Sequence, residues 1–173
     1  IGTALADDPL LTVRGVSPVP RRPPVRVVLD RAARLPLGSR LVRGVDEAPV
    51  LVLAGDVPGE AAARRAALAA AGVTVVVAPD LPAQLRALRA AGIGAVYCEG
   101  GAAVAEALLA AGAVDRLVIF RSPVRLGADA LRPRLAAGDD PAEPARPRLV
   151  HLRRFGDDTM AIYDLTSRVH RAG

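Results

Sequence analysis

Short β-branched runs alternate with Ala-rich and Leu-rich amphipathic segments along most of this 173-residue chain. The apolar runs predict strands at 25–30 (VRVVLD), 50–54 (VLVLA), 73–77 (VTVVV), 95–98 (AVYC) and 115–121 (DRLVIFR). Between them, the 3.6-residue pattern predicts helices at 59–72, at 81–92, and from the glycine pair at 100 and 101 to about residue 112. Strands that alternate with helices favour a mainly parallel α/β sheet with helices on both faces.

The C-terminal part of the chain has a different pattern. Residues 149–155 and 159–165 are two strand-like runs on either side of Gly156-Asp157-Asp158, which predicts an antiparallel hairpin that finishes the sheet. The intervening stretch 123–147 is rich in Pro, Gly and Asp, and we expect it to form a long loop.

The first fourteen residues combine a Gly-Thr step with two adjacent carboxylates, Asp7 and Asp8, followed by Pro9. Two acids before a proline are unfavourable inside a helix or a central strand, and proline pushes the residue before it out of the helical region. We therefore expect a shaped loop that leads into an extended piece, and such loops often carry function. Asp8 is interpreted as a turn-stabilising carboxylate rather than a catalytic one.

Composition narrows the classes of function. Apolar residues make up 51% of the chain, which excludes a disordered protein, and the length suits one domain. The net charge is +5, but only two Phe, two Tyr and no Trp are present, so we expect an anionic small molecule rather than nucleic acid. One cysteine and two histidines argue against a zinc site or a disulfide framework. No apolar run approaches the roughly 20 residues of a membrane span.

A predicted strand, then Glu99-Gly100-Gly101, then a helix forms a candidate phosphate site. A helix N-terminus offers unpaired backbone N–H groups and a partial positive charge, and glycine lets a ligand approach the backbone closely. By itself such a turn is more often a tight connection than a nucleotide site. Because a carboxylate repels phosphate, we expect Glu99 to point toward a different ligand. Cys98, on the predicted strand, is interpreted as an inert core thiol.

Several stretches together resemble one enzyme family. Residues 2–14 read GTALADDPLLTVR, residues 25–30 read VRVVLD, and the helix start reads EGGAAVAEALL. Ala113-Val114-Asp115, Pro123 and the pair Leu126-Gly127 follow in order. From residue 1 to about 165 this pattern resembles the reductase half of the bifunctional deaminase/reductase of riboflavin biosynthesis.

The resemblance implies a dihydrofolate-reductase-like fold and a cytoplasmic, NADPH-dependent oxidoreductase. The implied substrate is a phosphorylated pyrimidine, 5-amino-6-(5-phosphoribosylamino)uracil, which is reduced to the ribitylamino product. In the family, a strand and a helix that supply a lysine and a serine precede the Gly-Thr step. We therefore expect residues 1–173 to be one reductase domain that lacks these elements, with no deaminase domain in this chain.

The resemblance also implies roles for individual residues. Thr3 and Asp7 match positions that contact the cofactor, and Arg31 matches a cofactor position that is often serine. The substrate-contacting positions correspond to Leu11, Arg14 and Glu99. The positions of the turn and helix that hold the cofactor phosphates correspond to Gly101, Ala102, Ala103, Val104, Ala105, Glu106 and Ala107. No residue is assigned a catalytic role, and no metal is expected.

Two other functions remain open at this stage, namely a pterin or folate reductase of the same fold and a truncated, non-catalytic nucleotide-binding domain. Arg14 favours an anionic substrate. Arg31 and Arg34 lie just beyond the strand that ends at Asp30, where they suit a ribose 2′-phosphate and favour NADPH over NADH. Asp30 would favour a free ribose hydroxyl if it pointed there. A homodimer is left open.

Overall fold

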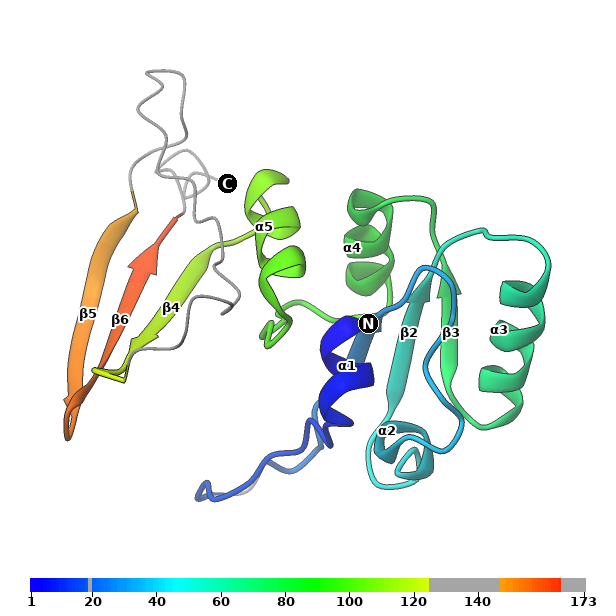
Figure 1. Cartoon of the computed structure of the whole chain (residues 1–173), viewed down its shortest axis with the longest axis horizontal. Helices are drawn as coiled ribbons and strands as arrows, with labels where there is room; N and C mark the ends of the chain where they lie inside the picture. The colour runs from blue at the N-terminus through cyan, green and yellow to red at the C-terminus, as the bar shows by residue number, and fades with distance from the viewer. Residues whose placement is uncertain (19, 125–146, 166–173) are drawn as a thin grey trace. The chain divides into compact units, whose positions relative to one another are not determined.

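The computed structural model describes residues 1–18, 20–124 and 147–165. The chain divides into two compact units, Ile1–Glu99 and Gly100–Gly173. The elements of the first unit are α1 (Gly2–Asp7), β1 (Arg26–Leu29), α2 (Arg40–Arg43), β2 (Val50–Ala54), α3 (Glu60–Ala70), β3 (Thr74–Val77) and α4 (Leu81–Ala90). The elements of the second unit are α5 (Ala102–Ala110), β4 (Arg116–Arg121), β5 (Arg148–Phe155) and β6 (Asp158–Asp164) (Figure 1).

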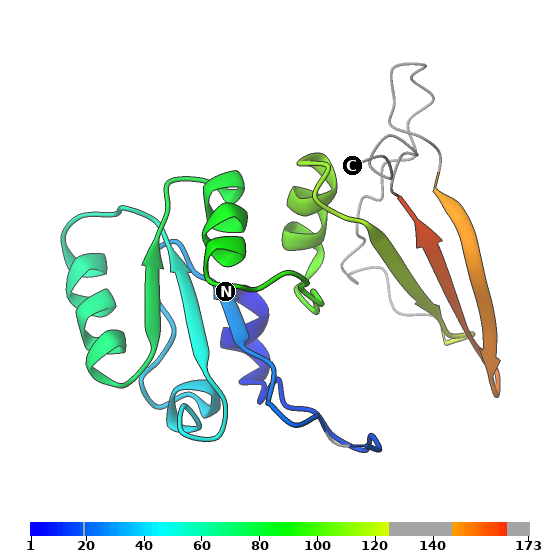
Figure 2. The ribbon, with the colours of Figure 1, turned by 180° about the vertical axis from the view of Figure 1, so that it is seen from behind.

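The first unit is a parallel sheet of order β1-β2-β3 that is covered on both faces. Every residue of the central strand β2 is buried, as expected for a strand with helices on each side. Alternate residues enter two clusters: Val52 packs with Leu68 of α3, while Leu53 packs with Leu88 of α4. Figure 2 shows α3 and α4 on opposite sides of the sheet. The predicted parallel sheet with helices on both faces is confirmed.

The second unit holds an antiparallel sheet of order β4-β6-β5. Its β5–β6 hairpin turns through Gly156, whose φ of 61° lies in the left-handed region that glycine adopts readily. The predicted C-terminal hairpin is therefore confirmed. The partner of β4 differs from the expectation, because β4 pairs antiparallel with β6 rather than joining the parallel strands. Most of the predicted loop, residues 125–146, lies outside the described residues.

Residues 95–98 do not form the predicted strand. Val96 and Tyr97 are 53% and 73% exposed, and Cys98 is exposed, so the interpretation of Cys98 as a core thiol is wrong. A four-residue strand gains its hydrogen bonds only from a neighbouring strand, and none of the described strands pairs with this segment.

The N-terminal segment also differs from its prediction, because Gly2–Asp7 is the helix α1 rather than a loop. Ala4, Leu5 and Ala6 favour a helix, and both carboxylates lie at its end rather than in its interior. The predicted break is correct: Asp8 leaves the right-handed helical region with φ of 40° immediately before Pro9. In the part of the chain that the structure describes, no helix combines the length and apolarity needed to cross a bilayer.

Candidate functional site

The carboxyl ends of β1, β2 and β3 lie at one edge of the parallel sheet, because the three strands run in the same direction. Ligands of open α/β sheets bind in the crevice outside these ends. Two of the segments that leave this edge are the turn at 30–35 after β1 and the loop at 55–57 after β2. They form the first part of the candidate site.

The side chain of Asp30 stabilises the turn at 30–35. The side chain is only 1% exposed, and its Oδ2 accepts a hydrogen bond from the Leu35 backbone N–H at 2.8 Å. The Ala33 N–H donates to the Asp30 carbonyl at 3.0 Å, and Ala33 itself has a φ of 52°. Oδ1 is buried without a hydrogen-bond partner among the described residues. Asp30 therefore points into the protein, while Arg31 and Arg34 of the same turn are exposed.

Arg31 lies across Gly55, the residue that follows β2. The Gly55 N–H donates to the Arg31 carbonyl at 2.9 Å. A Cβ at position 55 would lie 2.7 Å from Cγ of Arg31 and 3.2 Å from its carbonyl oxygen. Only glycine leaves room for this approach, so the loop after β2 supports the stem of the arginine at the sheet edge.

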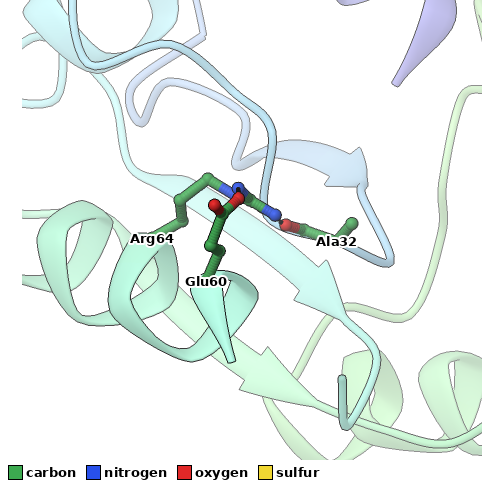
Figure 3. Close-up of polar contacts among 3 residues, drawn as sticks. All are labelled: Ala32, Glu60 and Arg64. Atoms are coloured by element: carbon green, nitrogen blue, oxygen red, sulfur yellow. Dashed lines mark hydrogen bonds and ion pairs between the residues drawn. The ribbon is translucent and has the colours of Figure 1, made fainter. Parts of the chain in front are cut away.

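Two consecutive arginines of α3 bind these two loops. Arg64 donates from Nε to the Ala32 carbonyl at 3.1 Å and from Nη1 to Glu60 Oε2 at 3.0 Å (Figure 3). Arg65 donates from Nη1 to the carbonyls of Gly55 and Val57, at 3.0 and 2.9 Å. Neither arginine is among the site residues that the sequence pattern predicts. The available signal was an Arg pair in the middle of an otherwise Ala-rich helix.

The N-terminal segment runs along β1. The nitrogen of Ile1 donates to the carbonyl of Leu29, the last residue of β1, at 2.9 Å. Thr3 is half-buried on α1, and Asp7 is exposed at the end of this helix. Asp8 Oδ1 accepts from the backbone N–H of Arg40, the first residue of α2, at 2.8 Å. This contact agrees with the interpretation of Asp8 as a structural carboxylate.

The loop that follows α1 is held from beneath by a buried arginine. Arg26 is 2% exposed, and its guanidinium donates to the carbonyls of Leu10, Gly44 and Ala48, at 3.3 Å for Leu10 and 2.6 Å for Gly44. Burial lowers the pKa of Arg26, and the charge of Glu47 partly offsets this effect. The sequence signal for this contact was an arginine inside an otherwise apolar strand.

The residues matched to the substrate follow this anchored point. Leu11 has a φ of 49° and packs half-buried against the core cluster of the first unit. Arg14 is exposed three residues farther along. Glu99 is also exposed, in a segment without regular secondary structure. The structure thus anchors the path of the loop and leaves the guanidinium of Arg14 at the surface.

The residues matched to the cofactor phosphates lie at the start of α5 in the second unit. Gly101 is the N-cap, with φ of −68° and ψ of 178°, and the described residues provide no side-chain cap at this end. Ala102, Ala103, Val104 and Ala105 form the first turn, followed by Glu106 and Ala107. The backbone N–H groups of this turn are thus presented by small or apolar residues without an acidic side chain among them, a composition that suits an anion.

Comparisons with known proteins give a consistent family. The family described as the RibD C-terminal domain matches residues 1–161. The chain is 35% identical to the 2,5-diamino-6-ribosylamino-4(3H)-pyrimidinone 5′-phosphate reductase of Methanothermobacter thermautotrophicus, over 94% of this chain and 76% of that protein. It is 32% identical to the riboflavin biosynthesis protein RibD of Bacillus amyloliquefaciens, over 80% of this chain but 37% of that protein.

Comparison with solved structures indicates the same family. The structure of Acinetobacter baumannii RibD matches with a TM-score of 0.77 and 27% identity, over 95% of this chain and 45% of that chain. This chain therefore spans less than half of the two RibD proteins and about three-quarters of the Methanothermobacter reductase. The match over residues 1–161, together with the Methanothermobacter relative, shows that the chain belongs to the RibD C-terminal domain family.

Proposed function

We propose that this chain is the reductase of riboflavin biosynthesis that passes a hydride from NADPH to a phosphorylated ribosylaminopyrimidine and forms the ribitylamino product. The observation that carries this proposal is the 35% identity to a reductase named for such a substrate, over 94% of this chain. The family match over residues 1–161 supports treating residues 1–173 as one reductase domain.

The residues present fit a phosphorylated nicotinamide cofactor. When bound, the cofactor supplies the hydride, and the protein supplies position and charge. The N-terminus of α5 presents backbone N–H groups beside small side chains, and Gly101 permits close approach of a phosphate. We assign the cofactor phosphates to Gly101 through Ala107, and further cofactor contacts to Thr3, Asp7 and Arg31.

A preference for NADPH over NADH follows from the turn after β1. Arg31 and Arg34 are both exposed there, and guanidinium groups bind phosphate in a bidentate manner. The carboxylate of Asp30 would oppose a 2′-phosphate if it faced the ligand. It is instead buried and accepts a hydrogen bond from Leu35, which supports the assignment of this turn to a phosphate.

The substrate contacts are assigned to Leu11, Arg14 and Glu99. Arg14 is exposed and follows a loop whose path is set by the bond from Arg26 to Leu10. Its side chain therefore extends from an anchored backbone and can meet the phosphate of the substrate. Glu99 is proposed to accept hydrogen bonds from the pyrimidine.

The proposal is tested by following the loss of NADPH absorbance with the purified protein and three substrates. These are 5-amino-6-(5-phosphoribosylamino)uracil, its 2,5-diamino-pyrimidinone counterpart, and dihydrofolate. We expect turnover with one or both of the phosphorylated pyrimidines and none with dihydrofolate. Binding of NADPH without turnover of either pyrimidine would instead support the non-catalytic alternative and refute the proposal.

A variant pair sharpens this test. Arg14→Ala should raise KM for the phosphorylated pyrimidine, whereas Arg86→Ala, at an exposed arginine of α4, should leave kcat and KM unchanged. An equal effect of both changes would show that general positive charge, rather than Arg14, attracts the substrate.

A further inference from the structure

Arg64 and Arg65 of α3 each reach a different loop at the carboxyl edge of the parallel sheet. Arg64 binds the Ala32 carbonyl in the turn after β1, and Arg65 binds two carbonyls, of Gly55 and Val57, in the loop after β2. The side chains of Arg64 and Arg65 are 41% and 15% exposed. They are therefore partly withdrawn from solvent and committed to backbone acceptors rather than displayed as surface charge.

The turn after β1 needs such restraint. Ala33 adopts a left-handed φ of 52°, which costs conformational energy for a residue with a Cβ. Besides the bond from the Ala33 N–H to the Asp30 carbonyl, three hydrogen bonds oppose that cost, one each at Arg31, Ala32 and Leu35. The partners are the Gly55 N–H, the Arg64 guanidinium and the Asp30 carboxylate. Among the described residues, the bond from Arg64 is the one that connects this turn to a helix.

The two contacts converge on Arg31. Arg64 holds the carbonyl of the residue after Arg31, and Arg65 holds the carbonyl of Gly55, over which the Arg31 stem lies. The backbone of Arg31 and the surface beneath its side chain are thus both tied to one rigid helix. The backbone next to Arg31 is therefore held by α3, although α3 itself is not among the residues matched to the cofactor.

We propose that Arg64 and Arg65 are positioning residues that set the selectivity for a ribose 2′-phosphate over a 2′-hydroxyl by fixing Arg31. This inference rests on the proposed function, in which Arg31 meets the cofactor. Recognition of phosphate by guanidinium depends on geometry, so a looser turn weakens binding of NADPH. NADH lacks the 2′-phosphate and does not use this contact, so its affinity is unaffected.

Glu60 supplies a matched control. It forms an ion pair with Arg64 but is 91% exposed, so solvent screens the pair. Glu60→Gln removes the charge and leaves the bond from Arg64 Nε to Ala32 in place. If overall charge near the site determines binding, Glu60→Gln should alter the affinity for NADPH. If the bond from Arg64 to Ala32 determines binding, Glu60→Gln should leave this affinity unchanged.

The test measures the dissociation constants of NADPH and NADH by nicotinamide fluorescence for the full chain. The set comprises the wild type, Arg64→Ala, Arg65→Ala, Arg31→Ala, Arg31→Ala/Arg64→Ala and Glu60→Gln. Arg64→Ala and Arg65→Ala should each lower the NADPH selectivity about 5-fold to 10-fold, the size of one ordinary net hydrogen bond. Affinity for NADH should change less than about 2-fold, and Glu60→Gln should match the wild type.

The double variant separates positioning from a general structural role. In the Arg31→Ala background, Arg64→Ala should cause no further loss of selectivity, because the group that it positions is absent. Equal weakening of both cofactors, or a selectivity loss that is undiminished without Arg31, would overturn the inference. The inference would also be overturned if Arg31→Ala abolished the selectivity for NADPH over NADH while Arg64→Ala left it unchanged.

Amide hydrogen exchange of the cofactor-free protein keeps this inference distinguishable from the proposed function. Arg64→Ala should speed exchange at the N–H groups of Leu35 and Gly55, which are bonded to the turn, and Glu60→Gln should not. Unchanged exchange in Arg64→Ala would refute the positioning role whatever the protein binds. Failure of the wild type to bind either cofactor would refute the proposed function, whatever the exchange shows.

Discussion

Replacing Arg26 with methionine should destabilise the first unit without disturbing its surface. Arg26 is the first residue of β1 and is 2% exposed, so methionine keeps the apolar stem while removing the guanidinium. The carbonyls of Gly44 and Ala48 then lose a buried donor, and the carbonyl of Leu10 loses a partly buried one. The change therefore tests whether one side chain joins β1, the end of α2 and the loop after α1.

The magnitude follows from opposing contributions. The Gly44 carbonyl still accepts from the Glu47 N–H at 3.0 Å, so the buried Ala48 carbonyl is the one that loses its donor, at a cost of about 1–3 kcal/mol. Removing a buried charge recovers part of this, because the desolvation penalty of the guanidinium disappears. We expect the free energy of unfolding to fall by about 1–2 kcal/mol, a sizeable share of the roughly 5–15 kcal/mol of a typical domain.

Lysine is the instructive second substitution. Arg26→Lys keeps the buried charge, but a single ammonium on a flexible stem cannot reproduce the planar fork that reaches three carbonyls. It retains the desolvation cost and loses hydrogen bonds, so we expect it to destabilise at least as much as methionine. The nominally conservative change should thus be no milder than the apolar one.

Urea unfolding followed by far-UV circular dichroism measures these differences. Arg43→Met, at an exposed arginine of α2, is the control and should stay within about 0.5 kcal/mol of the wild type. Equal stability of Arg26→Met and Arg43→Met, or clearly greater stability of Arg26→Lys than of Arg26→Met, would refute this role of Arg26.

The pH dependence of the Arg26 effect has a defined sign. Because burial lowers the pKa of Arg26, the unfolded chain holds this proton more tightly than the folded chain. Stability linked to Arg26 would therefore rise with pH, and only at strongly alkaline pH, where arginine begins to lose its proton. The difference between the wild type and Arg26→Met should be the same at about pH 6 and about pH 8.

Three further outcomes are expected. Gly101→Val should fold, because the extended backbone at the N-cap of α5 accepts any residue, but NADPH affinity should fall about 5-fold or more; unchanged affinity excludes phosphates from this helix end. Arg14→Ala and removal of the substrate phosphate should each raise KM, and the two increases should not add when both changes are combined. Full additivity of the two effects on KM in steady-state kinetics would show that Arg14 does not bind the phosphate. Asp8→Ala should lower the free energy of unfolding by about 1 kcal/mol, because the Asp8 carboxylate accepts from the first N–H of α2. Asp8→Asn keeps an acceptor oxygen and should retain most of the wild-type stability. Equal melting temperatures of Asp8→Ala and Asp8→Asn would show that this bond contributes nothing.

Local pattern determined most of the regular elements. The alternation of β-branched runs with Ala-rich segments located β1, β2, β3, α3, α4 and α5, because hydrophobic periodicity records which face of an element is buried. Pro9 marked the end of α1 through its own steric effect. The order of short stretches along the chain was sufficient to identify the family, because each stretch can be recognised without knowing what it touches.

Tertiary structure decided what each element meets. Residues 95–98 have the composition of a strand, but pairing depends on a neighbour that no local pattern specifies. In the same way, β4 was recognisable as a strand, whereas its antiparallel partner β6 was not. The bonds from Arg64 to Ala32 and from Arg26 to Ala48 join residues 32 and 22 positions apart. Such contacts are set by where the folded backbone places a carbonyl, and an arginine's local sequence does not encode the position of its distant acceptor.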